Sequence, residues 1–499
     1  MVELLAPGRL ELSRLEAWTS APPVRLALDP ASRPAIRAAA EVVARAAGGE
    51  APVYGVNTGF GKLARVRIPA DDIVELQRRI VLSHMCGVGE PLGDDIVRLV
   101  LVLKAASLGL GRSGAREATI DGLLGLLAAD ALPVVPCQGS VGASGDLAPL
   151  AHVAAALIGV GQIRLNGQTL PAAAALAKTG MMPLTLAAKE GLALLNGTQV
   201  STALAIAGLA KAWRLFEAAL VAGALSTDAA LGSDVPFDAR IHRARNQPGQ
   251  AEVAAVLARL LAGSEIRGSH LDCDRVQDPY SLRCQPQVMG AARDQLAAAA
   301  EVLEREANGV SDNPLVFAEE GEILSGGNFH AEPVAFAADG IALALAEIGN
   351  LSERRMALLT DASQSSLPAF LTPAPGLNSG FMIPQVVSAA LAAENKHLAN
   401  AVATDTIPTS ANQEDHVSFA TYAARRLHKM ADNLARLLAI ELMAAAQGVE
   451  LRRPLRSSGQ LERTLATVRE ACPFLTDDRP LGAEIEAVAG MVLAGRFRP

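Results

Sequence analysis

The chain has 499 residues, of which 50% are hydrophobic and only 3% aromatic, with a formal net charge of −8 and an isoelectric point of about 5.6. This acidic chain has no block of lysine and arginine that could follow phosphates, which excludes a typical nucleic-acid-binding protein. The mean hydropathy is +0.26, but the longest uncharged runs, 147–163 and 191–210, are interrupted by polar residues. No membrane partner is therefore expected.

The start of the chain, Met-Val-Glu-Leu-Leu, lacks the basic region and the long apolar run of a signal peptide. The cysteines are widely spaced and form no Cys-x-x-Cys pair; they are Cys86, Cys137, Cys273, Cys284 and Cys472. This spacing disfavours both a disulfide framework and a zinc site. We expect a cytoplasmic protein with reduced thiols and no bound metal.

The first 190 residues are broken by glycine and proline and indicate a loop-rich part of the chain. Residues 52–69 are expected to be mainly loop, and short strands are predicted at 134–135 and 162–165. The glycines that precede Lys62 do not form a phosphate-binding loop, because their spacing differs from that motif and Leu63 stands where serine or threonine is required.

From about residue 190 the hydrophobic pattern changes to that of long helices, predicted at 190–224, 286–307, 333–359, 384–401 and 412–447. Alanine and leucine, which dominate the apolar residues, favour close helix packing. No fixed-period repeat is visible. We expect one mostly-α unit over residues 1–499, with a loop-rich part at about 1–190, a long-helix bundle at about 191–450 and a C-terminal helical part at about 451–499.

The most informative motif is Ala143-Ser144-Gly145-Asp146-Leu-Ala-Pro-Leu. If the backbone nitrogen of Gly145 attacks the carbonyl carbon of Ala143, a five-membered ring closes; Gly145 offers an unhindered nitrogen. Loss of water from the ring and of the Ser144 hydroxyl leaves an exocyclic methylene. The product is an electrophile made from the backbone, 4-methylidene-imidazol-5-one (MIO). Ser144 does not fit a hydrolase elbow, because Asp146 stands where the second glycine is needed.

Other polar residues lie where a purely structural role is less common, although each also has a structural explanation. Two of the three tyrosines lie in polar loops, and an Asn-Gly pair interrupts an otherwise uncharged helix. Tyr54 and Tyr280 could simply pack their rings, and His84 could be an ordinary histidine at a helix end. Asn196 could belong to a hydrogen-bonded network between helices. Arg283 could form a surface ion pair, and Glu414 could be an acid at a helix N-terminus.

Taken together, these segments resemble the MIO-dependent aromatic amino-acid lyase family, in the same order and over almost the whole chain. The matching segments are Tyr54-Gly-Val-Asn-Thr-Gly-Phe-Gly, Ser83-His84, Ala143-Ser144-Gly145-Asp146, Asn196-Gly-Thr-Gln, Val276-Gln-Asp-Pro-Tyr-Ser-Leu-Arg-Cys-Gln-Pro-Gln, Ser325-Gly-Gly-Asn-Phe-His and Thr409-Ser-Ala-Asn-Gln-Glu-Asp-His. The resemblance implies a mostly-α long-helix bundle whose loop-rich N-terminal part carries the MIO turn. It also implies a homotetramer with shared active sites and no diffusible cofactor.

The resemblance implies a role for each matching position. The MIO group would form from Ala143-Ser144-Gly145, and the other catalytic residues would be Tyr54, as acid or base near the reacting carbon, with Tyr280 and Glu414. The substrate would be bound by Arg283 through its carboxylate, by Asn196 near the MIO oxygen, and by His84, Gln277, Asn313 and Phe329.

Within the family, the chain is most similar to the members that act on L-histidine. Related lyases of phenylalanine and tyrosine carry glutamine where Glu414 stands, and phenylalanine lyases lack the histidine at His84. A polar pair suits an imidazole, which has one donor and one acceptor. The implied reaction gives trans-urocanate and ammonia, the first step of histidine degradation. The alternatives are an MIO-dependent aminomutase, a lyase of another aromatic amino acid and, more remotely, a non-catalytic scaffold.

One position departs from the family pattern. Pro384 stands where a small residue such as alanine is expected, and a proline there starts or kinks the predicted helix. The chemistry that the resemblance implies does not depend on this residue.

Overall fold

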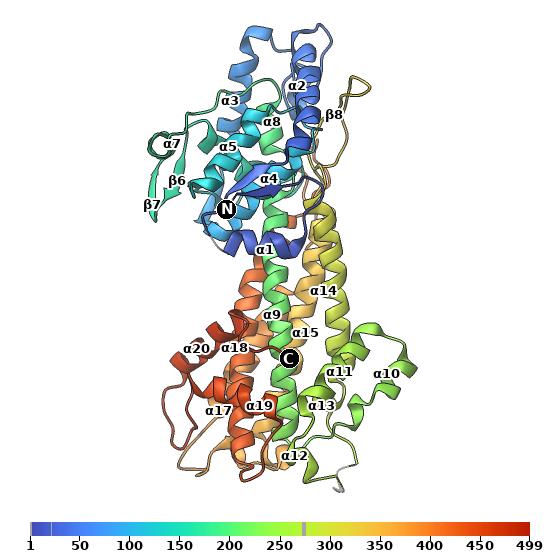
Figure 1. Cartoon of the computed structure of the whole chain (residues 1–499), viewed down its shortest axis with the longest axis vertical. Helices are drawn as coiled ribbons and strands as arrows, with labels where there is room; N and C mark the ends of the chain where they lie inside the picture. Colours follow the sequence, from blue (N-terminus) through green and yellow to red (C-terminus); the bar gives the residue numbers. More distant parts are fainter. Residues whose placement is uncertain (1, 21, 272–275) are drawn as a thin grey trace. The chain divides into compact units, whose positions relative to one another are not determined.

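The protein is mostly α-helical, with short strands between some of the helices (Figure 1). The computed structural model describes residues 2–20, 22–271 and 276–499, so Cys273 lies outside the described residues. The chain divides into two units. Unit 1 comprises Met1–Ala207, Ala300–Asp339 and Ala401–Arg425, and unit 2 comprises Gly208–Ala299, Gly340–Asn400 and Arg426–Pro499.

Unit 1 contains every strand of the described residues and the shorter N-terminal helices. Its helices are α1 (Leu12–Ser20), α2 (Arg33–Gly48), α3 (Ile73–His84), α4 (Asp94–Gly109), α5 (Glu117–Ala128), α6 (Leu147–Leu157), α7 (Ala172–Thr179) and α8 (Glu190–Leu195). Its strands are β1 (Glu3–Leu5), β2 (Leu26–Leu28), β3 (Val88–Pro91), β4 (Leu132–Pro133), β5 (Pro136–Gln138), β6 (Gln162–Leu165), β7 (Gln168–Pro171), β8 (Leu315–Phe317) and β9 (Glu322–Leu324).

The strands form small sheets rather than one central sheet. β1 pairs in parallel with β2, while β3 pairs with β5 and β8 with β9 in antiparallel register. β6 lies between β4 and β7 in a three-stranded antiparallel sheet, with Ile163 opposite both Pro133 and Leu170. The predicted strand at 162–165 is confirmed as β6. The strand predicted at 134–135 is wrong, because those two residues lie between β4 and β5.

Four long helices have residues in both units: α9 (Gln199–Ala229), α14 (Gln285–Ala307), α15 (Glu332–Thr360) and α18 (Ala420–Glu450). Unit 2 adds α10 (Ala239–Arg245), α11 (Pro248–Leu261), α12 (Glu265–Gly268), α13 (Tyr280–Arg283), α16 (Ala362–Ser365), α17 (Met382–Leu398), α19 (Gly459–Arg469) and α20 (Gly482–Leu493). Within unit 2 the long helices lie side by side, because side chains of α9 bond to α14 and α18 (Figure 1).

The predicted long helices are largely confirmed. The helices at 286–307 and 333–359 are α14 and α15, and the helix at 384–401 is α17, which begins two residues earlier. Pro384 is therefore the third residue of α17, in the first turn, where a missing N–H costs no helical hydrogen bond. The helix at 190–224 is divided into α8 and α9 by the Asn-Gly pair at Asn196.

The helix predicted at 412–447 begins too early. α18 starts at Ala420, and residues 409–416 form a loop closed by a bridge between Thr409 and Glu414. The backbone has positive φ at Ser410, Ala411 and Asn412, so a continuous helix is impossible there. Glu414 is thus a loop residue and not an acid at a helix N-terminus.

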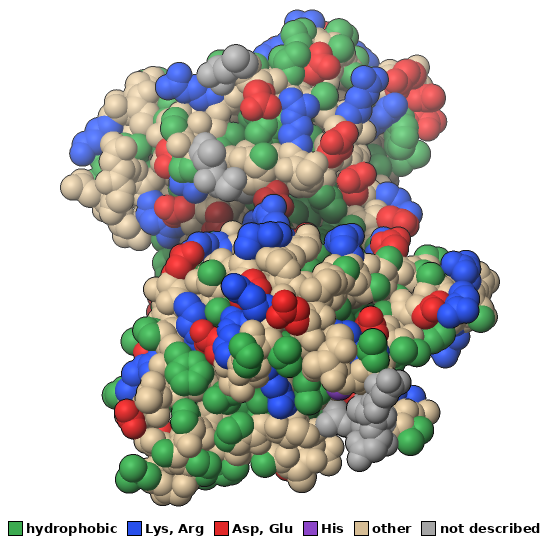
Figure 2. Space-filling model, turned by 60° about the horizontal axis from the view of Figure 1, so that its bottom comes forward, with side chains coloured by type: hydrophobic (Ala, Val, Ile, Leu, Met, Phe, Trp, Pro, Cys, Tyr) green, Lys and Arg blue, Asp and Glu red, His purple; other side chains and the backbone are tan. Residues whose placement is uncertain are grey.

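α15 is the one helix among residues 2–20, 22–271 and 276–499 that is long and apolar enough to cross a membrane. Its apolar window has a mean hydropathy of 1.5, and 72% of that window is buried within the structure, as a core helix would be. On the face drawn in Figure 2, lysine and arginine side chains lie interspersed with acidic ones and do not gather into one basic region.

Candidate active site in the Ser144 loop

The Ser144 loop, residues 139–146, connects β5 to α6 in unit 1. Its backbone turns sharply at three glycines with positive φ, namely Gly139 (133°), Gly142 (70°) and Gly145 (73°). Ala143 is buried and Ser144 is half-buried. The sequence therefore folds this segment into a tight loop that brings the Ala143 and Gly145 peptide groups close together, because glycine alone adopts such angles without strain.

Gly145 approaches the break between α8 and α9 so closely that no side chain fits there. A Cβ atom at Gly145 would lie 2.2 Å from the carbonyl oxygen of Gly197. The two glycines form a parallel bridge, and the Asp146 N–H donates to the same oxygen at 2.7 Å. Among the described residues, the Gly145 N–H donates no hydrogen bond. The Gly145 nitrogen is therefore fixed in position but donates no hydrogen bond within the described residues.

Asp146 anchors the end of the Ser144 loop. Its side chain is fully buried and accepts hydrogen bonds from the Ser201 N–H (2.7 Å) and hydroxyl (2.9 Å) on α9. Its other oxygen accepts from the hydroxyls of Ser140 (2.9 Å) and Thr421 (2.5 Å). These four donors satisfy the buried carboxylate, which bonds to no lysine or arginine among the residues that the structure describes. The loop is therefore rigidly joined to α9 and α18.

Ser144 makes two contacts that are relevant to cyclisation. Its hydroxyl donates to Glu414 Oε1 at 2.8 Å, and its carbonyl oxygen accepts from Asn196 Nδ2 at 2.7 Å. Asn196 follows the last residue of α8, where the helix breaks, and its buried Oδ1 has no hydrogen-bond partner within the described parts of the chain. An unpartnered buried acceptor beside the loop is a vacant position for a donor group of a ligand.

Glu414 joins the Ser144 loop to residues 409–416. Its Oε2 accepts from the hydroxyls of Thr409 (2.6 Å) and Ser410 (2.8 Å). Burial raises the pKa of Glu414, but the hydrogen bonds from Thr409, Ser144 and Ser410 and the nearby His84 outweigh burial, so the net pKa is below its usual value. Glu414 is therefore ionised at neutral pH.

Tyr54 and His84 lie near enough to Glu414 for its charge to affect both. Burial is the main cause of a raised pKa at Tyr54; the bond from the Gly61 N–H opposes it and the charge of Glu414 adds to it. Burial lowers the pKa of His84, while its bond to the Ile80 carbonyl and the charge of Glu414 oppose that shift. Tyr54 is thus a neutral phenol and His84 is mainly a neutral imidazole at pH 7.

The tautomer of His84 follows from its position at the end of α3. Its Nδ1 lies 2.9 Å from the carbonyl oxygen of Ile80, so Nδ1 carries the proton and donates it. The Nε2 atom of a neutral His84 then carries a lone pair and accepts hydrogen bonds. The Ser83 hydroxyl, 3.0 Å from Nδ1, is also near this bond.

These contacts satisfy what an MIO ring requires of its surroundings. The ring would retain the Ser144 carbonyl oxygen, which Asn196 already holds, and would lose the Ser144 hydroxyl, which points at Glu414. The Gly145 nitrogen is unengaged, and the positive φ of Gly145 suits the turn. The residues present therefore fit the group.

The other predicted residues of unit 1 have different environments. The Asn313 side chain donates to Ser325 Oγ at 3.1 Å and accepts from the Gly326 N–H at 2.6 Å, so it holds the loop that leads to α15. Phe329 is half-buried in that same loop. Within the described residues, Asn313 makes no hydrogen bond to Ser144, Glu414 or Asn196.

Three predicted residues belong to unit 2. Tyr280 begins the short helix α13 and is 70% exposed, and the guanidinium carbon of Arg283 lies 4.5 Å from the centroid of its ring. Arg283 Nε donates to the carbonyl oxygen of Asp278 at 2.9 Å, and Gln277 is exposed. The structure therefore places the half-buried guanidinium of Arg283 over the exposed ring of Tyr280.

Sequence reasoning missed Lys104. This lysine is buried in the middle of α4, and its Nζ donates to the backbone oxygens of Ala193 (3.2 Å) and Asn196 (2.7 Å). Burial lowers its pKa to about 7, against the opposing effect of Asp312 and Asp146. A lysine inside the apolar run 96–108 was a usable signal, since lysine is almost never buried without a partner.

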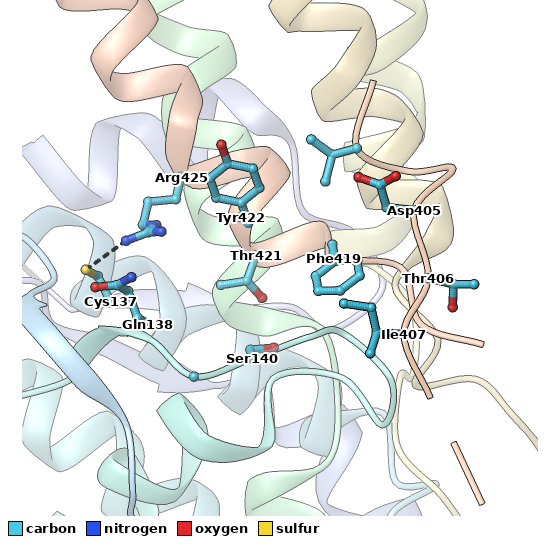
Figure 3. Close-up of a pocket in the computed structure, with 12 residues that line it drawn as sticks. Cys137, Gln138, Ser140, Asp405, Thr406, Ile407, Phe419, Thr421, Tyr422 and Arg425 are labelled. Atoms are coloured by element: carbon cyan, nitrogen blue, oxygen red, sulfur yellow. Dashed lines mark hydrogen bonds between the residues drawn. The ribbon is translucent and has the colours of Figure 1, made fainter. Parts of the chain in front are cut away.

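A cavity of about 490 Å³ is lined in part by Gly139 and Ser140, at the start of the Ser144 loop (Figure 3). Ser140 and Thr421 line it, and both bond to Asp146. Arg425 donates to the thiol of Cys137 at 3.3 Å and lies over the ring of Tyr422. Ser144, Glu414, Tyr54 and His84 are not among the lining residues. The candidate site is thus the cluster around Ser144 and not this cavity.

Comparisons with known proteins show the family of the chain. The sequence matches the family described as "Aromatic amino acid lyase" over residues 10–470, and the chain belongs to that family. It is 59% identical to a histidine ammonia-lyase of Aromatoleum aromaticum, covering 99% of this chain and 94% of that one. The structure is similar to histidine ammonia-lyase from Trypanosoma cruzi (TM-score 0.92, 38% identity, 100% and 94% of the two chains). It is equally similar to tyrosine aminomutase from Streptomyces globisporus (TM-score 0.93, 34% identity, 100% and 98%).

Proposed function

We propose that this chain is a histidine ammonia-lyase that converts L-histidine to trans-urocanate and ammonia. The observation that carries the proposal is the cluster in which Ser144, held by Asn196 at its carbonyl, points its hydroxyl at Glu414. Membership of the aromatic amino acid lyase family and 59% identity to a histidine ammonia-lyase support it.

The MIO ring formed from Ala143-Ser144-Gly145 would supply an electrophilic methylene for the substrate amine. Asn196 Nδ2, which donates to the Ser144 carbonyl oxygen, would hold the ring carbonyl oxygen, and its unpartnered Oδ1 would accept a hydrogen bond from the substrate. Glu414 is ionised and Tyr54 carries its proton, so the pair supplies one base and one acid beside the loop. Once the Ser144 hydroxyl has left, Glu414 Oε1 is free to accept a substrate proton.

Specificity for histidine follows from the hydrogen-bond acceptors that His84 and Glu414 offer to the substrate ring. His84 Nε2 accepts from a ring N–H of the substrate, as the bond from Nδ1 to the Ile80 carbonyl dictates. A phenyl ring offers no such donor and would leave His84 Nε2 and Glu414 Oε1 without a hydrogen-bond partner, which strongly disfavours its binding.

We infer a homotetramer of cytoplasmic enzyme in which copies share active sites. Arg283 would bind the substrate carboxylate through its planar fork, beside Tyr280, with Gln277, Phe329 and Asn313 contributing to the substrate-binding surface. The exposed Tyr280 ring and the exposed apolar residues of α17 support burial against other copies; Ile383 is 59% exposed and Val386 54%.

The test of the activity is a product analysis with L-histidine, L-phenylalanine and L-tyrosine. A lyase releases urocanate and ammonia, whereas an aminomutase returns a β-amino acid of unchanged mass. Intact mass of the same sample should be short by two water molecules in the wild type and not in Ser144→Ala. A β-histidine product would support the aminomutase alternative, and full mass in active protein would refute the MIO.

Shared sites are tested by mixing inactive variants. Ser144→Ala and Arg283→Leu homo-oligomers should each be inactive, and unfolding and refolding them together should restore part of the wild-type activity. Restoration requires that one copy supplies Ser144 and another supplies Arg283. A mixture that forms hetero-oligomers and stays inactive would contradict shared sites.

A further inference from the structure

We propose that His330, Glu332 and His416 form a binding site for a divalent transition-metal cation, with Zn²⁺ as the best match. One ligand atom from each of the three side chains lies within 4.8 Å of the others. His330 ends the loop after β9, Glu332 begins α15, and His416 lies in the 409–416 loop that carries Glu414. All three belong to unit 1.

The hydrogen bonds of His330 leave one ring nitrogen available. Nε2 lies 3.2 Å from the backbone carbonyl oxygen of His416, so Nε2 carries the proton and donates it. A neutral His330 then has its lone pair on Nδ1. This is the usual arrangement of a metal-binding histidine, in which the second nitrogen donates to a carbonyl and fixes the tautomer.

Nδ1 of His330 faces an oxygen that also lacks a partner. It lies 3.9 Å from Oε2 of Glu332, too far for a hydrogen bond. Glu332 Oε2 is itself buried and accepts no hydrogen bond from any described residue. Two electron-rich atoms thus face each other with a gap between them, and a cation in that gap would satisfy both.

The spacing suits a small cation after a modest closure. Zn²⁺ binds imidazole nitrogen at about 2.0–2.1 Å and carboxylate oxygen at about 2.0–2.2 Å, so two ligand atoms of a tetrahedral ion lie about 3.3–3.5 Å apart. His330 Nδ1 and Glu332 Oε2, at 3.9 Å, would therefore have to approach each other by about half an ångström. His416 is exposed, and its ring centroid lies 5.5 Å from that of His330, so a small movement of its side chain completes the set.

Two imidazoles and one carboxylate are a donor set for Zn²⁺ or a similar first-row ion, and leave one position for water. The sequence predicts no metal, because only the cysteine spacing was informative. His330 and His416 lie 86 residues apart, so no local motif reveals the set of ligands. The ion would link the start of α15 to the 409–416 loop and so limit the movement of Glu414, two residues before His416. Binding of the ion requires neither the MIO group nor turnover.

The test is metal binding by the full-length protein, stripped with chelator and titrated with ZnCl₂ or CoCl₂. We expect one ion per chain and a Co²⁺ spectrum of tetrahedral nitrogen and oxygen ligands without a thiolate charge-transfer band. His416→Asn and Glu332→Gln should each weaken binding at least about tenfold. His397→Asn, which removes an exposed histidine of α17, is the matched control and should bind as the wild type does.

The outcomes separate this proposal from the proposed function. Ser144→Ala should bind the ion like the wild type, although it forms no MIO. No uptake by the wild type, a thiolate spectrum, or affinity unchanged in both His416→Asn and Glu332→Gln would each overturn the site. Because the Co²⁺ spectrum is recorded on wild-type protein, the test holds even if a variant fails to fold.

Discussion

Glu414 and Glu441 are both glutamates with several hydrogen bonds, yet their surroundings differ in kind. Glu441, in α18 of unit 2, is fully buried and accepts from Ser226 Oγ at 2.7 Å and from Arg355 Nη2 at 3.0 Å, with a further bond from Ser352. Arg355 is also fully buried. Glu414 is half-buried, and within the described part of the chain its carboxylate accepts only from hydroxyls and bonds to no arginine or lysine.

This difference distinguishes a carboxylate that stabilises the fold from one that can take part in the reaction. The charge of Glu441 is neutralised by Arg355 in the helix bundle, so no bond is left for a ligand. Glu414 is ionised without a bonded cation, and one of its three donors is the Ser144 hydroxyl that cyclisation removes. A buried carboxylate with a full set of partners stabilises the fold, while one about to lose a partner can take part in a reaction.

The largest expected effect is that of Ser144→Ala. Alanine has no hydroxyl to lose, so no methylene forms, and turnover of L-histidine should fall by at least about three orders of magnitude. The melting temperature should stay close to that of the wild type, because Ser144 contributes only one half-buried hydrogen bond to Glu414. Activity near the wild-type level would refute the role of the Ser144 loop.

The comparison itself is tested by changing each glutamate to glutamine. Glu441→Gln leaves the Arg355 charge buried without its partner, which should lower the free energy of unfolding by about 3–5 kcal/mol. Glu414→Gln should change that free energy by less than about 1 kcal/mol and should instead reduce kcat. Denaturant titration of both variants, with assays below their midpoints, measures the two quantities. Equal destabilisation by both would contradict the distinction.

Much of this arrangement could be predicted from the sequence, because the motif at 143–150 and the long helical patterns are local signals. The break at Asn196 could be expected as well, since an Asn-Gly pair is costly inside a helix. The start of α18 could not, because positive φ at Ser410, Ala411 and Asn412 depends on the bonds that Glu414 makes in the fold. The polar side chains that hold the site also come from distant segments, as Lys104 and Asn196 do.

A smaller effect is expected on specificity. Replacing His84 by Phe and Glu414 by Gln removes the acceptors for an imidazole N–H, so histidine turnover should fall steeply and phenylalanine turnover should rise modestly. The ratio of kcat/KM for histidine over phenylalanine should drop by at least about 10²-fold. Each single variant serves as the control for additivity. A ratio that does not move toward phenylalanine would show that these residues do not recognise the ring.

The smallest effect on turnover is expected at Lys104, whose Nζ donates to the backbone carbonyl oxygen of Asn196. Burial lowers its pKa from 10.5 to about 7 in the folded protein. Between pH 7 and about 10 the unfolded chain therefore holds a proton on this lysine that the folded chain has released, and the free energy of unfolding should rise with pH through this window. Below pH 7 both states are protonated, and the contribution becomes constant.

Lys104→Met removes this titration, so the stability difference between wild type and variant should move in favour of the wild type as pH rises from 7 to 10. Urea titrations at several pH values measure it, with the exposed Lys178→Met as the control that keeps the wild-type slope. Parallel pH curves for Lys104→Met and the wild type would mean that Lys104 remains charged in the fold. The ammonium would then hold the Asn196 carbonyl as a buried cation, and its nearest compensation would be the charges of Asp312 and Asp146.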